Sequence, residues 1–420
     1  MRFEFVDPVK LYASLKDEHN PFILEFEKFR ESKYTLVSAN PTFTLKIGKF
    51  GTKIDNDRFS KEMNPFKALK SFKSLPGILV GYIPHDFVHY YLEKDFDEES
   101  VFCYYENFFA YDGSTLTFYG KDVEWAKKVV ERAKKIDVKS EKISSEILYT
   151  DASFEEFVEM VEKAKDYIYA GDAFQIVLSR SYVVKNDADP FKIYLRMREI
   201  NPSPYMFLVD FDKKIVGTSP ETMASIFNGV LKVNPIAGTT ARGKNEYEDL
   251  ILAKEMLSSE KEIAEHVMLV DLARNDVRKV CKTGTVEVTR FMDVLKYSHV
   301  QHIESEVVGK IEDDKDCFDA AEAAFPAGTL IGAPKLRAIE IIDEIEKSKR
   351  RIYGGCVGYF LNSSAEMAIA IRMVEIDKNC EVRAGAGVVA DSKAENEFIE
   401  TERKMAAVLL ALGVKDDSSY

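Results

Sequence analysis

Hydrophobic residues recur every three or four positions over residues 154–168, and this spacing predicts an amphipathic helix. Ser153 and Glu156 form a capping box at its start. Similar spacing, with start signals such as Asp189-Pro190, predicts several more helices along the chain. These cover residues 190–200, 246–280, 317–325, 335–349 and 394–412.

Runs of β-branched and aromatic residues predict strands between these helices. Asn228-Gly229, which separates two such runs, is the signal of a type I′ hairpin turn. Paired strands interspersed with helices indicate an α+β protein and not a regular alternation of the two. The predicted strands cover 34–38, 42–48, 77–83, 114–120, 173–184, 205–211, 214–219, 224–227, 230–233, 355–361, 367–376 and 381–390, with more strands within 285–311.

A polar, charged stretch over residues 134–150 predicts a boundary along the chain. The N-terminal region, 1–148, carries few chemical groups in a recognisable pattern. The region 149–415 carries nearly all of the candidate motifs, so we expect the chemistry there.

Composition excludes several classes of function. A chain of 420 residues that is 46% hydrophobic can bury a large core and is not a disordered scaffold. Its net charge of −13 argues against nucleic acid or an anionic membrane as a partner. The start of the sequence is unlike a signal peptide, no apolar run has membrane-spanning length, and five scattered cysteines suit a reducing compartment, so we expect a cytoplasmic protein.

Two predicted helices each carry a pair of glutamates three residues apart, Glu262 with Glu265 and Glu397 with Glu400. Residues at this spacing share one helix face. The first helix continues as HVMLVDLA, which is too apolar for a surface helix, and buried carboxylates there would need neutralisation. Two interpretations follow from the spacing: two solvated faces, or a cage of four carboxylates for a divalent cation such as Mg²⁺.

Cys356 lies in the sequence GGCVG, which matches the turn that carries the nucleophile in amidotransferases. That chemistry also needs a base, normally a later histidine, and none of the six histidines follows Cys356. We therefore interpret Cys356 as a small buried residue and expect no glutaminase activity from this chain.

From about Asp166 to Met405 the sequence resembles the chorismate-utilising enzymes, and among them most closely the large component of anthranilate synthase. The resemblance implies an α+β fold in which antiparallel sheets form a sandwich-like core with helices packed outside. The motifs that carry it read GDAFQIVLSR, NPSPYMF, TSPE, PIAGTTARG, KEIAEHVMLVDLARNDV, HIESEVVG, FPAGTLIGAPKLRAIEIIDEIE, YGGCVGY, AIAIR, AGAGVVADS and ENEFIETERK.

The resemblance favours the metal interpretation of the glutamates. It implies that Mg²⁺ binds the ring carboxylate of chorismate, with Glu265 and Glu400 as direct ligands and Glu262 and Glu397 as supporting ones. It also implies that Tyr353, Arg372, Lys404 and the backbone of Gly385, Ala386 and Gly387 bind the second substrate carboxylate. Arginine suits a carboxylate through paired hydrogen bonds, and glycines let main-chain N–H groups approach closely.

Two positions distinguish the reactions within the family. Isochorismate and salicylate synthases have a water-activating lysine where this chain has Gln175, and some aminodeoxychorismate synthases have a nucleophilic lysine where it has Ala237. Both residues favour amination at ring carbon 2 by free ammonia. The alternatives are aminodeoxychorismate synthase component I, which makes the 4-amino product, and a non-catalytic regulatory subunit.

Three residues match catalytic positions of the family. Glu221 would be the general acid that protonates the departing hydroxyl at carbon 4, and His302 would assist loss of pyruvate by removing the proton at carbon 2. Thr329 would contact the substrate. Without the resemblance, the preferred interpretation of His302 would be a structural histidine in a strand.

Partners and regulation also follow from the resemblance. Ammonia would come from a separate glutamine amidotransferase subunit, in a heterodimer or heterotetramer. Tryptophan would be a feedback inhibitor, bound by Pro204, Tyr205 and Met206 with an N-terminal L-L-E-S motif. This chain has TLVS at residues 35–38, which keeps the serine and has Val37 in place of the glutamate, so Ser38 is predicted to contribute.

Overall fold

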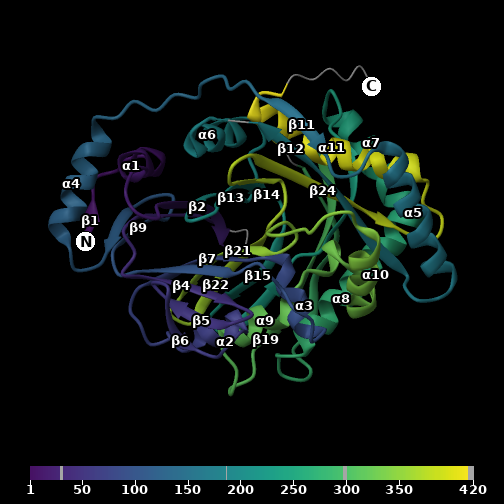
Figure 1. Cartoon of the computed structure of the whole chain (residues 1–420), viewed down its shortest axis with the longest axis horizontal. Helices are drawn as coiled ribbons and strands as arrows, with labels where there is room; N and C mark the ends of the chain where they lie inside the picture. Colours follow the sequence, from purple (N-terminus) through teal and green to yellow (C-terminus); the bar gives the residue numbers. More distant parts are fainter. Residues whose placement is uncertain (29–31, 186, 297–299, 415–420) are drawn as a thin grey trace.

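Two large antiparallel sheets form the centre of the molecule in the computed structural model, which describes residues 1–28, 32–185, 187–296 and 300–414. The first sheet lies towards the top of Figure 1, and the short strand β20 (Gly332–Ala333) pairs with its strand β12. In spatial order its other strands are β1 (Arg2–Phe3), β10 (Leu116–Tyr119), β9 (Phe108–Tyr111), β3 (Ser32–Ser38), β2 (Phe22–Lys28), β13 (Tyr205–Asp210), β14 (Lys214–Ser219), β23 (Met373–Ile376), β24 (Cys380–Val388), β12 (Gln175–Lys185) and β11 (Glu146–Thr150).

The second sheet is packed against the first, and β18 (Glu287–Lys296) pairs with its strand β19. Its other strands, in spatial order, are β17 (Ile236–Ala241), β19 (Val300–Lys310), β16 (Val230–Val233), β15 (Thr222–Phe227), β22 (Ser364–Ile369), β21 (Cys356–Leu361), β7 (Ile78–Ile83), β8 (Ser100–Tyr105), β4 (Phe43–Gly48), β5 (Gly51–Ile54) and β6 (Asp57–Ser60).

Helices cover the outer faces of both sheets, which gives three apolar layers. Aromatic and aliphatic side chains of β2, β13, β7 and β21 fill the space between the sheets. Outside the first sheet pack α1 (Pro8–Leu15), α4 (Val123–Lys134), α6 (Pro190–Ile200) and α11 (Ala394–Leu412). Outside the second sheet pack α2 (Pro65–Lys70), α8 (Glu260–Arg278) and α9 (Cys317–Ala324), whereas α10 (Lys335–Ile345) and α5 (Phe154–Tyr169) pack against β12 of the first sheet.

The predicted sandwich of antiparallel sheets with external helices is therefore confirmed. Both sheets contain strands from either side of the predicted boundary near residue 148. The N-terminal region 1–148 thus shares its sheets with region 149–415 and completes the same sandwich. The helices not yet named are α3 (Val88–Tyr91) and α7 (Glu246–Ser258), with short 3₁₀ turns η1 (His85–Phe87) and η2 (Gly328–Leu330).

Local signals in the sequence are reproduced closely. The capping box of Ser153 and Glu156 begins α5, and α6 begins at Pro190 after the Asp189 cap. Asn228 and Gly229 both have positive φ angles, of 52° and 72°, as a type I′ turn requires. The five cysteines are free and buried, and no helix in the described part of the chain is long and apolar enough to cross a membrane.

The helix predicted over 246–280 is in fact two helices. Ser259 has an extended backbone between them, and its hydroxyl accepts a hydrogen bond from the N–H of Glu262. A serine N-cap of this kind starts a new helix axis. The direction of α8, and with it the position of its glutamates, is therefore independent of α7.

The strand predicted over 367–376 is also divided. Arg372 adopts a left-handed conformation with φ of 49°, an uncommon geometry for a side chain with a Cβ. Before it, β22 belongs to the second sheet, and after it, β23 belongs to the first. Arg372 therefore lies where the chain crosses between the two sheets.

Candidate active site

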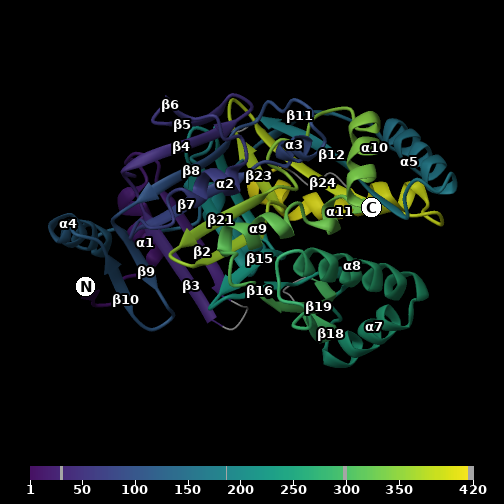
Figure 2. The ribbon, with the colours of Figure 1, turned by 90° about the horizontal axis from the view of Figure 1, so that it is seen from below.

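The first turns of the two glutamate-bearing helices, labelled α8 and α11 in Figure 2, lie close to each other. Lys261 of α8 reaches across to α11, where its Nζ lies 3.9 Å from Oε1 of Glu397. Glu397 is only 3% exposed. Glu262 and Glu397 are 135 residues apart in sequence, and the contact between the first turns of their helices shows that the two acidic faces are not independent.

The electrostatics of the four carboxylates show that they share one space. Burial raises the pKa values of Glu262, Glu265 and Glu397, and the negative charge of Glu400 raises each of them further. Burial also acts on Glu400, but the ammonium group of Lys404, 2.5 Å away, holds its pKa below the usual value. Negative charge is therefore concentrated in a half-buried space.

Gln175, at the start of β12, orients one of these carboxylates. Its Nε2 donates a hydrogen bond of 2.9 Å to Oε1 of Glu265. Gly387 of β24 leaves the space that this amide needs, since a Cβ there would lie 2.6 Å from the same nitrogen. Oε1 of Gln175 is buried and has no hydrogen-bond partner among the described residues.

The donor set is compatible with a hard divalent cation. All four groups offer carboxylate oxygens, which Mg²⁺ prefers. Within the described ranges, no three acidic, histidine or cysteine side chains are already close enough to hold an ion together. Mg²⁺ typically keeps several waters and uses one or two carboxylates directly, so a looser arrangement of this kind fits it.

A β-bulge in β17 faces these carboxylates. Gly238 has a φ of 62°, and a Cβ on it would lie 3.1 Å from Oε2 of Glu262. Its carbonyl oxygen lies 3.1 Å from Nδ1 of His302 in β19. Since a carbonyl only accepts, Nδ1 carries the proton in neutral His302, and Nε2 carries the lone pair of a potential base. Ala237, beside the bulge, is buried.

The basic residues predicted to bind the second carboxylate are grouped beside the acidic space. Burial lowers the pKa of Arg372, while Tyr353, Glu400 and Glu221 oppose this effect, so the guanidinium lies near all three. Nζ of Lys404 donates a 2.9 Å hydrogen bond to the carbonyl of Gly385. A Cβ on Gly385 would lie 3.3 Å from the Tyr353 hydroxyl, so position 385 has little room for a larger side chain.

Glu221 and Thr329 line one small cavity of about 30 Å³. The cavity runs beside α8, where it is bounded by Leu269 and Asp276, and Leu269 is one helical turn beyond Glu265. The Thr329 hydroxyl is buried and has no hydrogen-bond partner among the described residues. Glu221 is 6% exposed. The structure thus brings together the predicted acid and the predicted substrate contact.

The residues of the predicted tryptophan site do not all lie together. Met206 is paired with Glu25 across β13 and β2, and Tyr205 with Phe26. Ser38 is paired with Phe22, so it lies roughly 13 Å further along the strands and one strand further away. Its hydroxyl donates to the carbonyl of Asn107.

The strand next to Pro204, Tyr205 and Met206 is instead Ile23-Leu24-Glu25-Phe26. This segment keeps the Leu-Glu of the L-L-E-S motif and lacks its serine, whereas TLVS keeps the serine and lacks the glutamate. Neither match is better by sequence, and only the strand pairing distinguishes them. Glu25 is therefore the residue that sequence reasoning missed.

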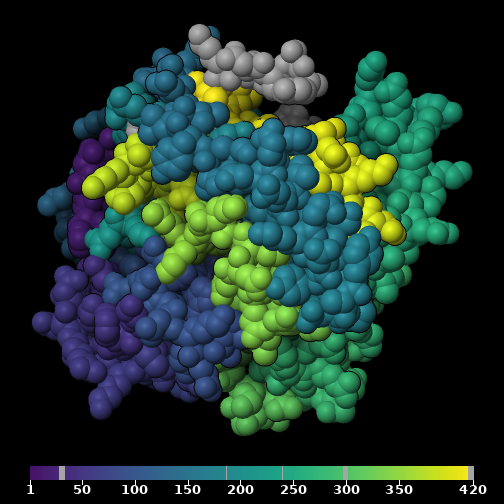
Figure 3. Space-filling view, turned by 45° about the vertical axis from the view of Figure 1, so that its right-hand side comes forward, coloured from purple at the N-terminus to yellow at the C-terminus, as the bar shows by residue number. Residues whose placement is uncertain are grey.

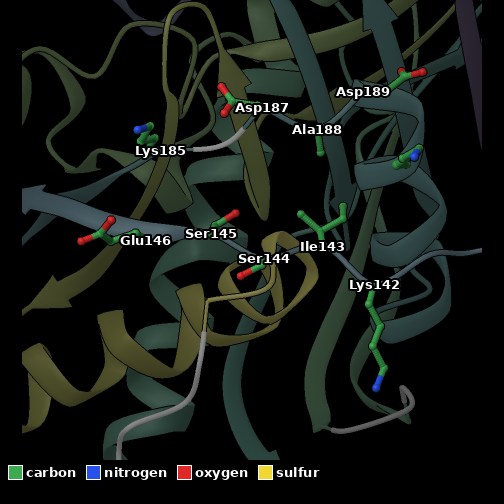
Figure 4. A pocket seen from close by; sticks show the side chains of 10 residues that line it. Lys142, Ile143, Ser144, Ser145, Glu146, Lys185, Asp187, Ala188 and Asp189 are labelled. Atoms are coloured by element: carbon green, nitrogen blue, oxygen red, sulfur yellow. The ribbon is translucent and has the colours of Figure 1, made fainter.

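A separate concavity lies elsewhere. It has a volume of about 670 Å³ and is lined by exposed charged residues of the linker before β11 and of the loop before α6, such as Lys142 and Asp187 (Figure 4). None of the predicted site residues lines it.

Figure 3 shows the α7–α8 region in green beside the yellow α11, on the face that carries the acidic helices.

Comparison with known proteins agrees with this geometry. Residues 20–410 match the family described as chorismate binding enzyme. The chain belongs to this family. The predicted resemblance to chorismate-utilising enzymes is therefore confirmed over nearly the whole length.

Three relatives within the chorismate-binding family are similar over nearly their full length. Anthranilate synthase component 1 of Thermococcus kodakarensis is 54% identical, with 98% of each chain covered. The protein of the same name from Archaeoglobus fulgidus is 50% identical, covering 98% of this chain and 100% of its own. The crystal structure of anthranilate synthase component I from Streptococcus pneumoniae matches with a TM-score of 0.80 at 31% identity, covering 90% and 92% of the two chains.

These comparisons bear on the alternatives left open by the sequence. The predicted function, that of an anthranilate synthase component, is confirmed by these relatives, and this chorismate-binding enzyme is a lyase. For the roles of individual residues, the metal and the tryptophan site, the support is the geometry described above.

Proposed function

We propose that this chain converts chorismate and ammonia into anthranilate, pyruvate and water at the space between α8 and α11. The observation that carries the proposal is the convergence of the two E-x-x-E helices beside Gln175 and Ala237. Neither of these two side chains can act as the lysine base or lysine nucleophile of related enzymes. The nucleophile must then be a free small molecule.

Glu265 and Glu400 would hold Mg²⁺ directly, with Glu262 and Glu397 acting through water. The bound ion would neutralise the ring carboxylate of chorismate and fix its orientation. Gln175 supports this role, because its hydrogen bond to Oε1 of Glu265 leaves the other oxygen to face the ion. A local cation also explains how a dianion enters a protein of net charge −13.

The enolpyruvyl carboxylate would bind on the opposite, basic side of the site. The Arg372 guanidinium, the Tyr353 hydroxyl and the main chain of Gly385–Gly387 are grouped there, next to Lys404. A buried guanidinium with paired donors binds a carboxylate strongly and in one orientation. The two ends of chorismate would thus be held by groups of different chemistry.

Ammonia would add to carbon 2, and the hydroxyl would leave carbon 4 as water with a proton from Glu221. His302 would then take the proton at carbon 2, and the ring would become aromatic as the bond from carbon 3 to oxygen breaks and pyruvate leaves. The hydrogen bond from Nδ1 to the Gly238 carbonyl supports this role, because it keeps the lone pair on Nε2.

Ammonia would reach the site either from solution or from a glutamine amidotransferase subunit in a heterodimer or heterotetramer. The buried Cys356, whose pKa burial raises strongly, is unsuited to glutaminase chemistry. We further propose a cytoplasmic location, which five free cysteines support.

The purified chain tests this function directly. We expect it to form anthranilate, detected by fluorescence, from chorismate, Mg²⁺ and ammonium. With glutamine in place of ammonium, we expect product only when an amidotransferase subunit is added. Formation of the 4-amino isomer would favour aminodeoxychorismate synthase, and tight chorismate binding without turnover would favour a regulatory subunit.

Tryptophan would inhibit the enzyme by binding where β13 meets β2. What supports this is a partly buried carboxylate at that point: Glu25 accepts hydrogen bonds from Tyr194 and from both Nε and Nη2 of Arg198, at 2.6 and 3.1 Å for the latter two. This carboxylate is an acceptor for the ammonium group of an amino acid.

We expect Glu25→Gln to raise the tryptophan concentration for half inhibition by roughly 10-fold or more, because a hydrogen bond to a charged group contributes about 1.5–3 kcal/mol. Ser38→Ala should leave that concentration within about twofold, since Ser38 lies along another part of the sheet. Inhibition of anthranilate formation with ammonium as nitrogen source measures both. Loss of inhibition in Ser38→Ala, with Glu25→Gln unaffected, would restore the original assignment.

A further inference from the structure

The loop that carries Thr329 is held by a buried lysine that follows it. Lys335 is the first residue of α10, and its side chain is 12% exposed. Its Nζ donates a hydrogen bond of 2.6 Å to the carbonyl of Pro326, at the start of the same loop. The ammonium group thus closes residues 326–335 into a compact turn.

The same ammonium group joins the loop to α8. Nζ of Lys335 lies 2.5 Å from Oδ2 of Asp276, whose side chain is 8% exposed. Asp276 is on the helix that carries Glu262 and Glu265. Its other oxygen, Oδ1, accepts from Lys279 at 2.9 Å, so the carboxylate is fully engaged on one side of the helix.

The loop packs closely onto α8 at Gly328. A Cβ on Gly328 would lie 2.0 Å from Cδ2 of Leu272 and 3.4 Å from Cε of Lys335. From the other side, Nη1 of Arg350 donates a 2.6 Å hydrogen bond to the carbonyl of Leu330. The residue between these two fixed points is Thr329, whose hydroxyl lines the cavity with Glu221.

We propose that Lys335 is a positioning residue that sets the distance between Thr329 and Glu221 by tying the Thr329 loop to Asp276 of α8. This inference rests on the proposed function, because its effect is on turnover of chorismate. The lysine does not touch the substrate. It fixes the position along α8 of the loop that forms one wall of the cavity.

The test is Lys335→Met, which keeps the length and apolar stem of the side chain and removes its donors. We expect kcat/KM for chorismate, with ammonium, to fall by 30-fold or more, while the Mg²⁺ concentration for half activity in the wild-type and variant enzymes stays within twofold. The double variant Lys335→Met/Asp276→Asn removes the unpaired buried charge. It should regain melting temperature and remain slow, because the Pro326 carbonyl still lacks its donor.

The matched control is Lys213→Met. Lys213 is also partly buried and pairs with two carboxylates, Glu98 and Glu375, and it precedes β14, at the opposite end of that strand from Glu221. It should lower the melting temperature without changing kcat/KM. A folded Lys335→Met enzyme of normal kcat/KM, or a double variant of restored kcat/KM, would overturn the positioning role. Wild-type enzyme that makes no anthranilate would instead overturn the proposed function.

Discussion

Replacing Glu400 with glutamine should lower Mg²⁺-dependent anthranilate formation by more than about 100-fold, because loss even of groups behind the metal ligands commonly costs 10- to 100-fold in affinity or activity. The glutamine keeps the shape of the side chain but removes the charge that Lys404 stabilises at 2.5 Å. A titration of activity against Mg²⁺ at saturating chorismate and ammonium measures the effect.

The matched control lies on the same helix. Glu395 is an exposed acidic residue in the first turn of α11, and Glu395→Gln changes the net charge by the same amount. It should retain the wild-type Mg²⁺ dependence. Both variants should melt close to the wild-type temperature, because the Glu400 side chain is half exposed and its loss leaves no cavity. Full activity of Glu400→Gln at low Mg²⁺ would refute the metal site.

Replacing His302 with asparagine should slow anthranilate formation by about 10²–10⁴-fold, the usual contribution of a general base. Asparagine can still donate to the Gly238 carbonyl, as Nδ1 of His302 does at 3.1 Å, so the bulge in β17 should persist. What it lacks is a basic nitrogen for the carbon-2 proton. We therefore expect an aminated, non-aromatic intermediate to accumulate, detected by chromatography and mass spectrometry.

The intermediate distinguishes this role from a structural one. A histidine that only supports the strand would slow both steps together, and chorismate would disappear as slowly as anthranilate appears. Glu221→Gln provides the opposite comparison, because it should block the first step and leave chorismate unconsumed. If His302→Asn slowed chorismate consumption and anthranilate formation equally, with no intermediate, the assignment of His302 as the base would be wrong.

Much of the site could be predicted because its chemistry is carried by short local patterns. Two glutamates three apart must share a helix face wherever the helix lies, and the Ser153 capping box and Asn228-Gly229 turn depend only on neighbouring residues. The same local reasoning failed at Arg372. A continuous hydrophobic run over 367–376 predicts one strand, but the chain changes sheets within it.

The tryptophan site shows the same limit more sharply. TLVS and ILEF each retain half of one motif, and both are strands of the first sheet. Which of them lies beside Pro204–Met206 depends on the order of strands in the sheet. That order brings residues about 180 positions apart in sequence into contact. Local sequence patterns do not specify which distant strands pair.

By itself, the sequence determined the composition of the candidate site: four carboxylates, an arginine, a histidine, and a glutamine and an alanine where lysines would give other reactions. Only the tertiary structure decided that these groups meet. It brought α8 and α11 together through Lys261 and Glu397, placed Arg372 at the crossing of two sheets, and closed the Thr329 loop with Lys335. The physical reason is that side-chain chemistry is local, whereas proximity results from packing two sheets whose strands come from both ends of the chain.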